Sequence, residues 1–168
     1  MNENRIIEHS ESYSEDDTSS NHYLYLWMAF NVMYDHFSRE DGAGRIELDH
    51  VCHCVRKLPY DDWIDIFASH ELMVLLSITP IFDEKNGRIG NTQKFDEFKR
   101  LCSIPVTGIE DQDISKLDAL MALLYLVRCN QVHGMKNKRD IRDVEVFNAT
   151  EPILNVIVGK LAFHFGII

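Results

Sequence analysis

The sequence predicts an all-α fold, and three observations carry that prediction. Apolar residues recur at three- and four-residue spacing through most of the chain, which is the period of one helix face. No run of alternating apolar and polar residues indicates a strand, and no internal repeat divides the chain. With 168 residues and 45% hydrophobic side chains, the chain has the length of one domain and can bury a core of ordinary size. We therefore expect a bundle of about five to six helices in a single domain over residues 19–168.

Three helices are predicted in the first half of the chain, and each ends at a breaking signal. The first spans about 20–39 and is followed by the sequence "DGAG". A shorter helix over 45–58 ends at Pro59, and a third over about 61–78 has an acidic first turn and stops before Pro80. The first helix carries a stripe of aromatic residues at helical spacing: Tyr23, Trp27, Phe30, Tyr34 and Phe37.

Three further helices are predicted in the second half. A polar loop over 82–91 leads into a helix over 92–102. A longer helix begins near residue 113, and Gly134 is placed to end it as a C-terminal cap. The last segment keeps one helical phase across Pro152, which favours one kinked helix over two separate ones. The residues in phase are Val144, Phe147, Leu154, Val158, Leu161 and Phe165.

The charge of the chain is unevenly distributed. A net charge of −10 argues against a protein whose whole surface binds nucleic acid. Residues 1–20 hold six acidic residues against one basic residue, so we expect a disordered acidic tail over residues 1–18. Residues 128–142 have the opposite balance, with Asp140 as the one acid. The basic residues of this segment are Arg128, Lys136, Lys138, Arg139 and Arg142.

Several classes of protein are disfavoured by composition. The chain has no run of eighteen apolar residues, so no membrane span is predicted. Its N-terminus is polar and acidic, which does not resemble a secretory signal. We therefore expect a cytoplasmic protein. Four cysteines at irregular spacing are expected to be small core residues in a reducing compartment. An alternative is zinc held by His50, Cys52 and Cys54, although no second cluster completes a tetrahedral site. We therefore expect no metal and no cofactor.

One charged residue interrupts an apolar helix face. The stripe that contains Leu117 and Leu124 continues at Arg128, where a charged side chain is costly unless it is paired or used. His133 follows five residues later. The planar donors of arginine suit a phosphate, and histidine transfers protons near neutral pH, so the pair favours phosphoryl chemistry. In the alternative, Arg128 pairs with a carboxylate of another helix, for example Asp35, and His133 only marks the helix end.

The spacing of the pair has a geometric consequence. Five residues turn a regular helix through about 140°, so the two side chains would not share a face. A helix that ends at Gly134 can unwind and let His133 reach the groove of Arg128.

The residues around this pair resemble a known family. The stretch "RCNQVHG" resembles the motif of an arginine, four to six residues and a histidine in HEPN domains, a helical superfamily named for higher eukaryotes and prokaryotes nucleotide-binding. The stretch "WMAFNVMY" resembles the W-x-x-F-N-x-x-Y sequence that some of these proteins carry upstream. The resemblance covers 20–39 and 113–165. Arg128 and His133 match the catalytic pair, whereas Cys129 stands where active members usually have a polar residue and Asn130 follows one step later.

The resemblance implies a bundle of four or more helices that commonly dimerises, and in many members a metal-independent endoribonuclease. Some members are toxins paired with a nucleotidyltransferase-like antitoxin, and others belong to antiviral (phage defence) systems. The implied catalytic residues are Arg128, His133 and, as a third candidate, Asn130. We expect the basic cluster of Lys136, Lys138, Arg139 and Arg142 to bind the RNA backbone. The alternative is a non-catalytic HEPN-like module that binds a nucleotide or a partner protein.

Two features of the first predicted helix allow more than one interpretation. Trp27, Phe30 and Tyr34 have the residue type that stacks on bases, but their helical spacing is typical of a core. Asn31 and Asp35 lie one turn apart on the polar side of that stripe. They either orient the Arg-His motif or face water.

Overall fold

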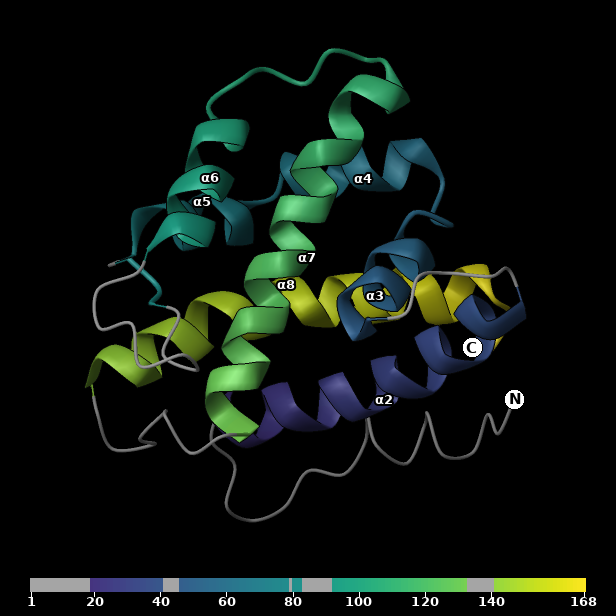
Figure 1. The fold of residues 1–168 in the computed structure, drawn as a ribbon, viewed down its shortest axis with the longest axis horizontal. Coiled ribbons are helices and arrows are strands. Elements are labelled where there is room, and N and C mark those ends of the chain that lie inside the picture. Colours follow the sequence, from purple (N-terminus) through teal and green to yellow (C-terminus); the bar gives the residue numbers. More distant parts are fainter. Residues whose placement is uncertain (1–18, 41–45, 79, 83–91, 133–140) are drawn as a thin grey trace.

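The chain is all-α over the residues that the computed structural model describes, which are 19–40, 46–78, 80–82, 92–132 and 141–168. The predicted all-α class is therefore confirmed for these residues, which form no strand and seven helices rather than the expected five to six (Figure 1). The helices are α2 (Ser19–Glu40), α3 (Glu47–Val55), α4 (Tyr60–Phe67), α5 (His70–Ser77), α6 (Gln93–Cys102), α7 (Glu110–Val132) and α8 (Ile141–His164).

The helix predicted over 61–78 is wrong, because two helices, α4 and α5, occupy that stretch. The break lies at Ser69, whose hydroxyl accepts a hydrogen bond from the backbone N–H of Leu72 at 3.2 Å. The same hydroxyl donates to the carbonyl of Ile66 at 2.8 Å, so one side chain serves both helix ends. The apolar period continues across this break, and for that reason the pattern alone did not reveal it. A serine in an N-cap position was the available signal.

Ser69→Ala should lower the free energy of unfolding by about 1 kcal/mol, because it leaves the first N–H groups of α5 without the capping oxygen. Ser77→Ala is the matched control, since Ser77 is exposed at the other end of α5 and donates only to the carbonyl of Val74. Its effect should stay within about 0.5 kcal/mol. Urea denaturation of both variants measures the difference, and equal losses would contradict the capping role.

The two long C-terminal helices follow the predictions over their described lengths. Helix α7 begins at Glu110, three residues before the predicted start, and is described as far as Val132. The predicted cap at Gly134 lies outside the described residues. Helix α8 continues through Pro152 as one helix, although proline lacks the N–H that an interior helical hydrogen bond needs.

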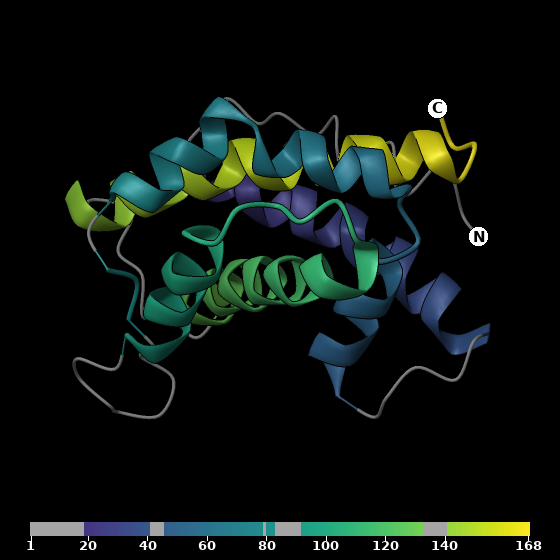
Figure 2. The ribbon, with the colours of Figure 1, turned by 90° about the horizontal axis from the view of Figure 1, so that it is seen from above.

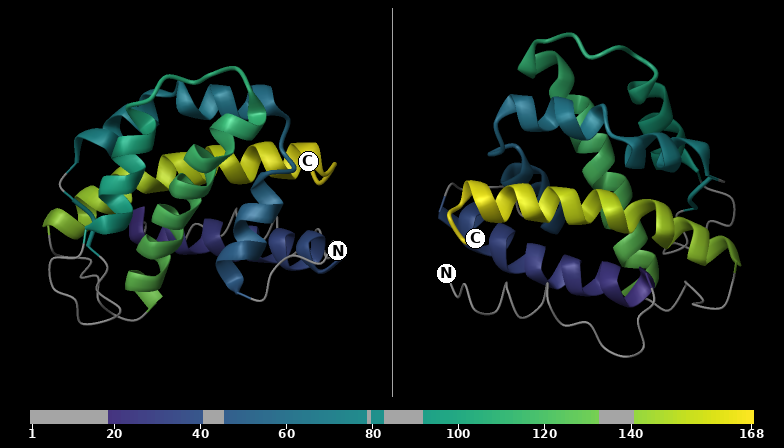
Figure 3. Two further views of the ribbon diagram at one scale, coloured as in Figure 1. Left: turned by 45° about the horizontal axis from the view of Figure 1, so that its top comes forward. Right: turned by 180° about the vertical axis from the view of Figure 1, so that it is seen from behind.

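The helices form two layers. In one layer α8 lies between α2 on one side and the α4–α5 pair on the other, which Figure 3 shows from behind. Helix α7 crosses this layer with α3 and α6 on its two sides, as Figure 2 shows from above. The hydrophobic core lies between the layers and includes side chains from every described helix. None of the described helices is both long enough and apolar enough to cross a membrane.

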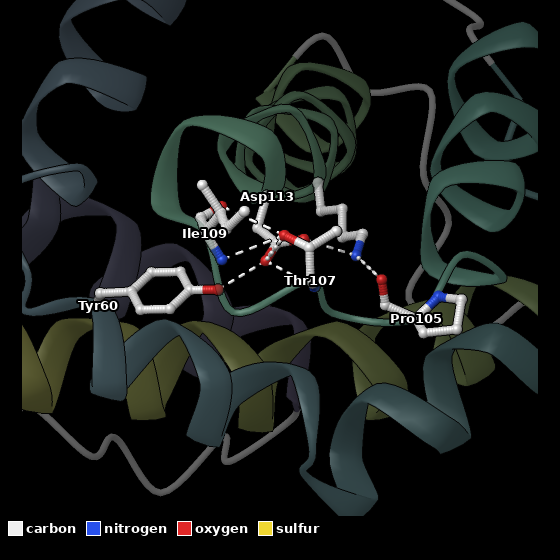
Figure 4. A network of polar contacts seen from close by, with 6 residues as sticks. Tyr60, Pro105, Thr107, Ile109 and Asp113 are labelled. Atoms are coloured by element: carbon white, nitrogen blue, oxygen red, sulfur yellow. Dashed lines mark hydrogen bonds and ion pairs between the residues drawn. The ribbon is translucent and has the colours of Figure 1, made fainter.

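A buried ion pair fixes the start of α7. Lys116 and Asp113 are only 3% and 1% exposed, and the Nζ of Lys116 lies 2.8 Å from Oδ1 of Asp113. Figure 4 shows how this pair holds its surroundings: Lys116 donates to the carbonyl of Pro105 at 2.8 Å, and the hydroxyl of Tyr60 donates to Asp113 at 2.6 Å. The backbone N–H and the hydroxyl of Thr107 donate to Oδ2 of the same carboxylate at 2.9 and 3.0 Å.

The pKa of Asp113 reports the balance of these contacts. Burial alone would raise the pKa of Asp113, but the hydrogen bonds from Lys116, Tyr60 and Thr107 outweigh burial and hold this pKa well below its ordinary range. The carboxylate therefore stays charged and ties the 105–107 segment and α4 to α7. Sequence patterns did not reveal this network, because an Asp–Lys pair three residues apart on a helix is usually a surface pair.

Candidate functional site

Arg128 lies where the apolar stripe of α7 leaves the core. The Arg128 side chain is 22% exposed, whereas the preceding residues of the stripe are fully buried: Leu117, Leu120, Met121 and Leu124. Its Nη1 and Nη2 atoms each lie 3.4 Å from a carboxylate oxygen of Glu47, the first residue of α3. The predicted alternative of a carboxylate from another helix is thus found, but the partner is Glu47 and not Asp35.

Glu47 is bound more closely by two tyrosines than by the arginine. The hydroxyl of Tyr34 donates to one carboxylate oxygen at 2.5 Å and that of Tyr125 to the other at 2.9 Å. Burial, and then the hydrogen bond to Glu47, raises the pKa of both tyrosines, so both remain donors. Charge-assisted hydrogen bonds are usually about 2.7–2.9 Å long, so the Arg128–Glu47 contact at 3.4 Å is loose. Glu47 therefore orients Arg128 without using all five of its N–H donors.

The last turns of α7 cross the first half of α2 (Figure 1). Arg128 lines a groove between these two parts of the helices. Burial lowers the pKa of Arg128, but the Glu47 carboxylate and the Cys129 side chain outweigh burial and raise it, so the guanidinium keeps its charge. The groove has a volume of about 240 Å³. Its other lining residues are Leu24, Trp27, Met28, Asn31, Val32 and Val132.

Asn130, the third candidate catalytic residue, does not lie with Arg128. It is fully buried, and its Nδ2 donates to the carbonyl of Phe82 at 2.8 Å. Its Oδ1 has no hydrogen-bond partner within the described part of the chain. Arg142 binds the same segment, because it donates to the carbonyl of Pro80 at 2.7 Å and its guanidinium lies 4.0 Å from the centre of the Phe82 ring. Asn130 and Arg142 thus anchor residues 80–82.

The remaining predicted site residues, His133, Lys136, Lys138 and Arg139, lie outside the described residues. Val132 is the last described residue of α7 and lines the groove of Arg128. His133 is the next residue in the chain.

A larger cavity of about 630 Å³ lies between α3, α6 and α7, and no sequence motif had indicated it. In it, Arg56 forms a two-point ion pair with Asp118. Asp49 and Glu97 also line the cavity, so its carboxylates outnumber its arginine by three to one. Excess negative charge repels anions, so of the two cavities the groove of Arg128 is the better place for a phosphate.

Three of the four cysteines are buried, as predicted, and the fourth is only half-buried. All four are free thiols, with Cys52, Cys54 and Cys129 buried and Cys102 half-buried. Burial raises the pKa of both Cys52 and Cys54 to about 12, so these thiols remain protonated. Across the described ranges, no group of three or more histidine, cysteine, aspartate or glutamate side chains is arranged to hold a metal ion.

Comparison with known proteins gives no match: no family model, no curated protein and no solved structure is similar to this chain.

Proposed function

We propose that the protein is a metal-independent endoribonuclease of HEPN type, built on a HEPN-like helical bundle. The observation that carries the proposal is the state of Arg128. It is charged and partly buried, it lines a groove, and its loose contact with Glu47 leaves donors for a phosphate. Val132 lines this groove, and the next residue in the chain is His133, which matches the histidine of the Arg-His motif.

In the proposed reaction the 2′-hydroxyl of RNA attacks the neighbouring phosphorus. His133 acts as general base or acid, and Arg128 stabilises the charge that develops on the phosphate oxygens. The leaving 5′-oxygen takes up a proton, so the products are a 2′,3′-cyclic phosphate and a 5′-hydroxyl. Asn130, the third candidate residue, does not contact the substrate in this proposal; its buried amide bonds to the Phe82 carbonyl and ties residues 80–82 to the end of α7. Lys136, Lys138 and Arg139 bind the RNA backbone on either side, and Arg142 does so in addition to its contacts with Pro80 and Phe82.

The proposal extends to partners. The active form is a homodimer, because two copies of the site around one axis offer two arginines and two histidines to the substrate. As a toxin or an antiviral effector in the cytoplasm, the protein is controlled by a nucleotidyltransferase-like antitoxin. No metal and no cofactor takes part in the proposed reaction.

A second candidate function is a non-catalytic HEPN-like module that binds a nucleotide or a protein. The observation that favours it is structural: Arg128 has an ion-pair partner, and the amide of Asn130 bonds to the backbone of Phe82. Both residues thus have contacts that need no substrate.

Labelled RNA incubated with the purified protein in excess EDTA should be cut, and Arg128→Lys should reduce the cleavage rate by roughly 10²–10³-fold, because lysine keeps the charge but not the two-point contact. The free energy of unfolding should change by no more than about 1 kcal/mol, because the pair with Glu47 is partly exposed.

Arg56→Lys is the matched control, since Arg56 pairs with Asp118 in the other cavity and should leave cleavage unchanged. Intact RNA after incubation with folded wild-type protein would favour the non-catalytic module. Normal cleavage by a folded Arg128→Lys variant would remove Arg128 from the site.

A further inference from the structure

The groove beside Arg128 has the size of a single ring system. Its volume of about 240 Å³ lies below the range of roughly 300–1,000 Å³ that is usual for drug-sized ligands. A whole nucleotide chain therefore does not fit inside it, but one flat ring does. The groove is open to solvent at Met28 and Val132, which are 39% and 53% exposed.

The lining combines an apolar surface with two polar groups. Leu24, Met28, Val32 and Val132 supply aliphatic walls, and Trp27, a residue that is only 2% exposed, also lines the groove. The polar groups are the guanidinium of Arg128 and the half-buried side chain of Asn31. Proteins that recognise single-stranded RNA stack splayed-out bases on aromatic side chains or on the plane of an arginine guanidinium, and they bond to the polar edges of those bases.

The amide of Asn31 has the chemistry for such an edge. It offers two donors and one acceptor, and a side-chain amide pairs with adjacent donor and acceptor positions on a base. Trp27 and Asn31 lie one turn apart on α2, on the side of the helix that faces the groove. The sequence left open whether Asn31 faces water, and the structure places it in the same groove as Arg128.

We propose that this groove binds one unstacked nucleobase of the RNA and that Asn31 reads the hydrogen-bonding edge of that base. The inference rests on the proposed function, since it takes Arg128 as the group that holds the adjoining phosphate. A protein side chain is a poorer occupant, because an apolar side chain would cover the Asn31 amide without bonding to it and would leave Arg128 with only its loose contact to Glu47. The consequence is a preference for one base next to the cleaved bond, set by a residue on α2.

Asn31→Asp tests the proposal, because it replaces the amide donors with an acceptor and keeps the shape of the side chain. In RNA that contains all sixteen dinucleotide steps, the ratio of kcat/KM between the best and the worst base should change by roughly tenfold or more. The ratio is the measurement because the added negative charge also slows cleavage at every step. Asn31→Leu should flatten the preference, and Asn155→Asp, an exposed asparagine of α8, is the control that leaves it unchanged.

A binding measurement separates this proposal from the proposed function. The four nucleoside 3′-monophosphates and inorganic phosphate are titrated into wild-type protein and Asn31→Asp by calorimetry in EDTA. We expect one monophosphate to bind at least tenfold more tightly than phosphate, and Asn31→Asp to abolish that difference. If RNA is not cut but one monophosphate binds more tightly and Asn31→Asp abolishes that difference, the endoribonuclease proposal is rejected and the base site is supported. If RNA is cut with a preference that ignores both Asn31 variants, or no monophosphate binds better than phosphate, the base site is rejected.

Discussion

His133→Ala should reduce the rate of RNA cleavage by roughly 10²–10⁴-fold, the range that a positioned proton donor or acceptor contributes. The reason is chemical, because alanine can neither remove the proton of the attacking 2′-hydroxyl nor supply one to the leaving oxygen. The melting temperature should hardly move, since the helix-end position that the sequence predicts for His133 contributes few core contacts. Single-turnover kinetics on one defined RNA, together with thermal unfolding, measures both effects.

His164→Ala is the control for that variant. His164 is exposed in the last turn of α8 and does not line the groove of Arg128, so its loss should leave the cleavage rate within twofold of wild type. Cleavage at the wild-type rate by His133→Ala, in a preparation free of other nucleases, would show that His133 is not the proton-transfer group.

Lys116→Met should lower the free energy of unfolding by about 3–5 kcal/mol, because it leaves the Asp113 carboxylate buried without its cation. Methionine keeps most of the volume of the lysine side chain, so lost packing contributes little. The destabilisation should shrink below about pH 4, since wild-type Asp113 has a lowered pKa and its contribution fades as the pH falls below the ordinary pKa of aspartate. Urea denaturation at neutral and acidic pH measures the change.

Arg100→Met is the matched control, because Arg100 and Glu97 form an ion pair with the same three-residue spacing on α6. Their side chains are 58% and 50% exposed, so water already screens this pair and its loss should cost about 0–1 kcal/mol. Equal losses in the two variants would mean that burial does not set the strength of the Asp113–Lys116 pair.

The helices were predictable from the sequence because their signal is local. The three- and four-residue period and the breaking residues placed six helices, and the continuous phase across Pro152 predicted the single helix α8. The break at Ser69 was missed because a cap can interrupt a helix without disturbing the apolar period. The core positions of Trp27 and Phe30 were also readable from spacing, and the structure confirms that both are buried.

The sequence also determined that Arg128 is anomalous, since a charge on an apolar stripe needs a partner or a ligand. It did not determine which partner, because Glu47 lies 81 residues away and meets Arg128 only when α3 packs beside α7. The same holds for Asn130 and Arg142, whose bonds to residues 80–82 depend on how three separate segments meet. Local periodicity decides which residues form a helix and which face is apolar, whereas the contacts of a polar side chain across the bundle are set by packing, which only the tertiary structure shows.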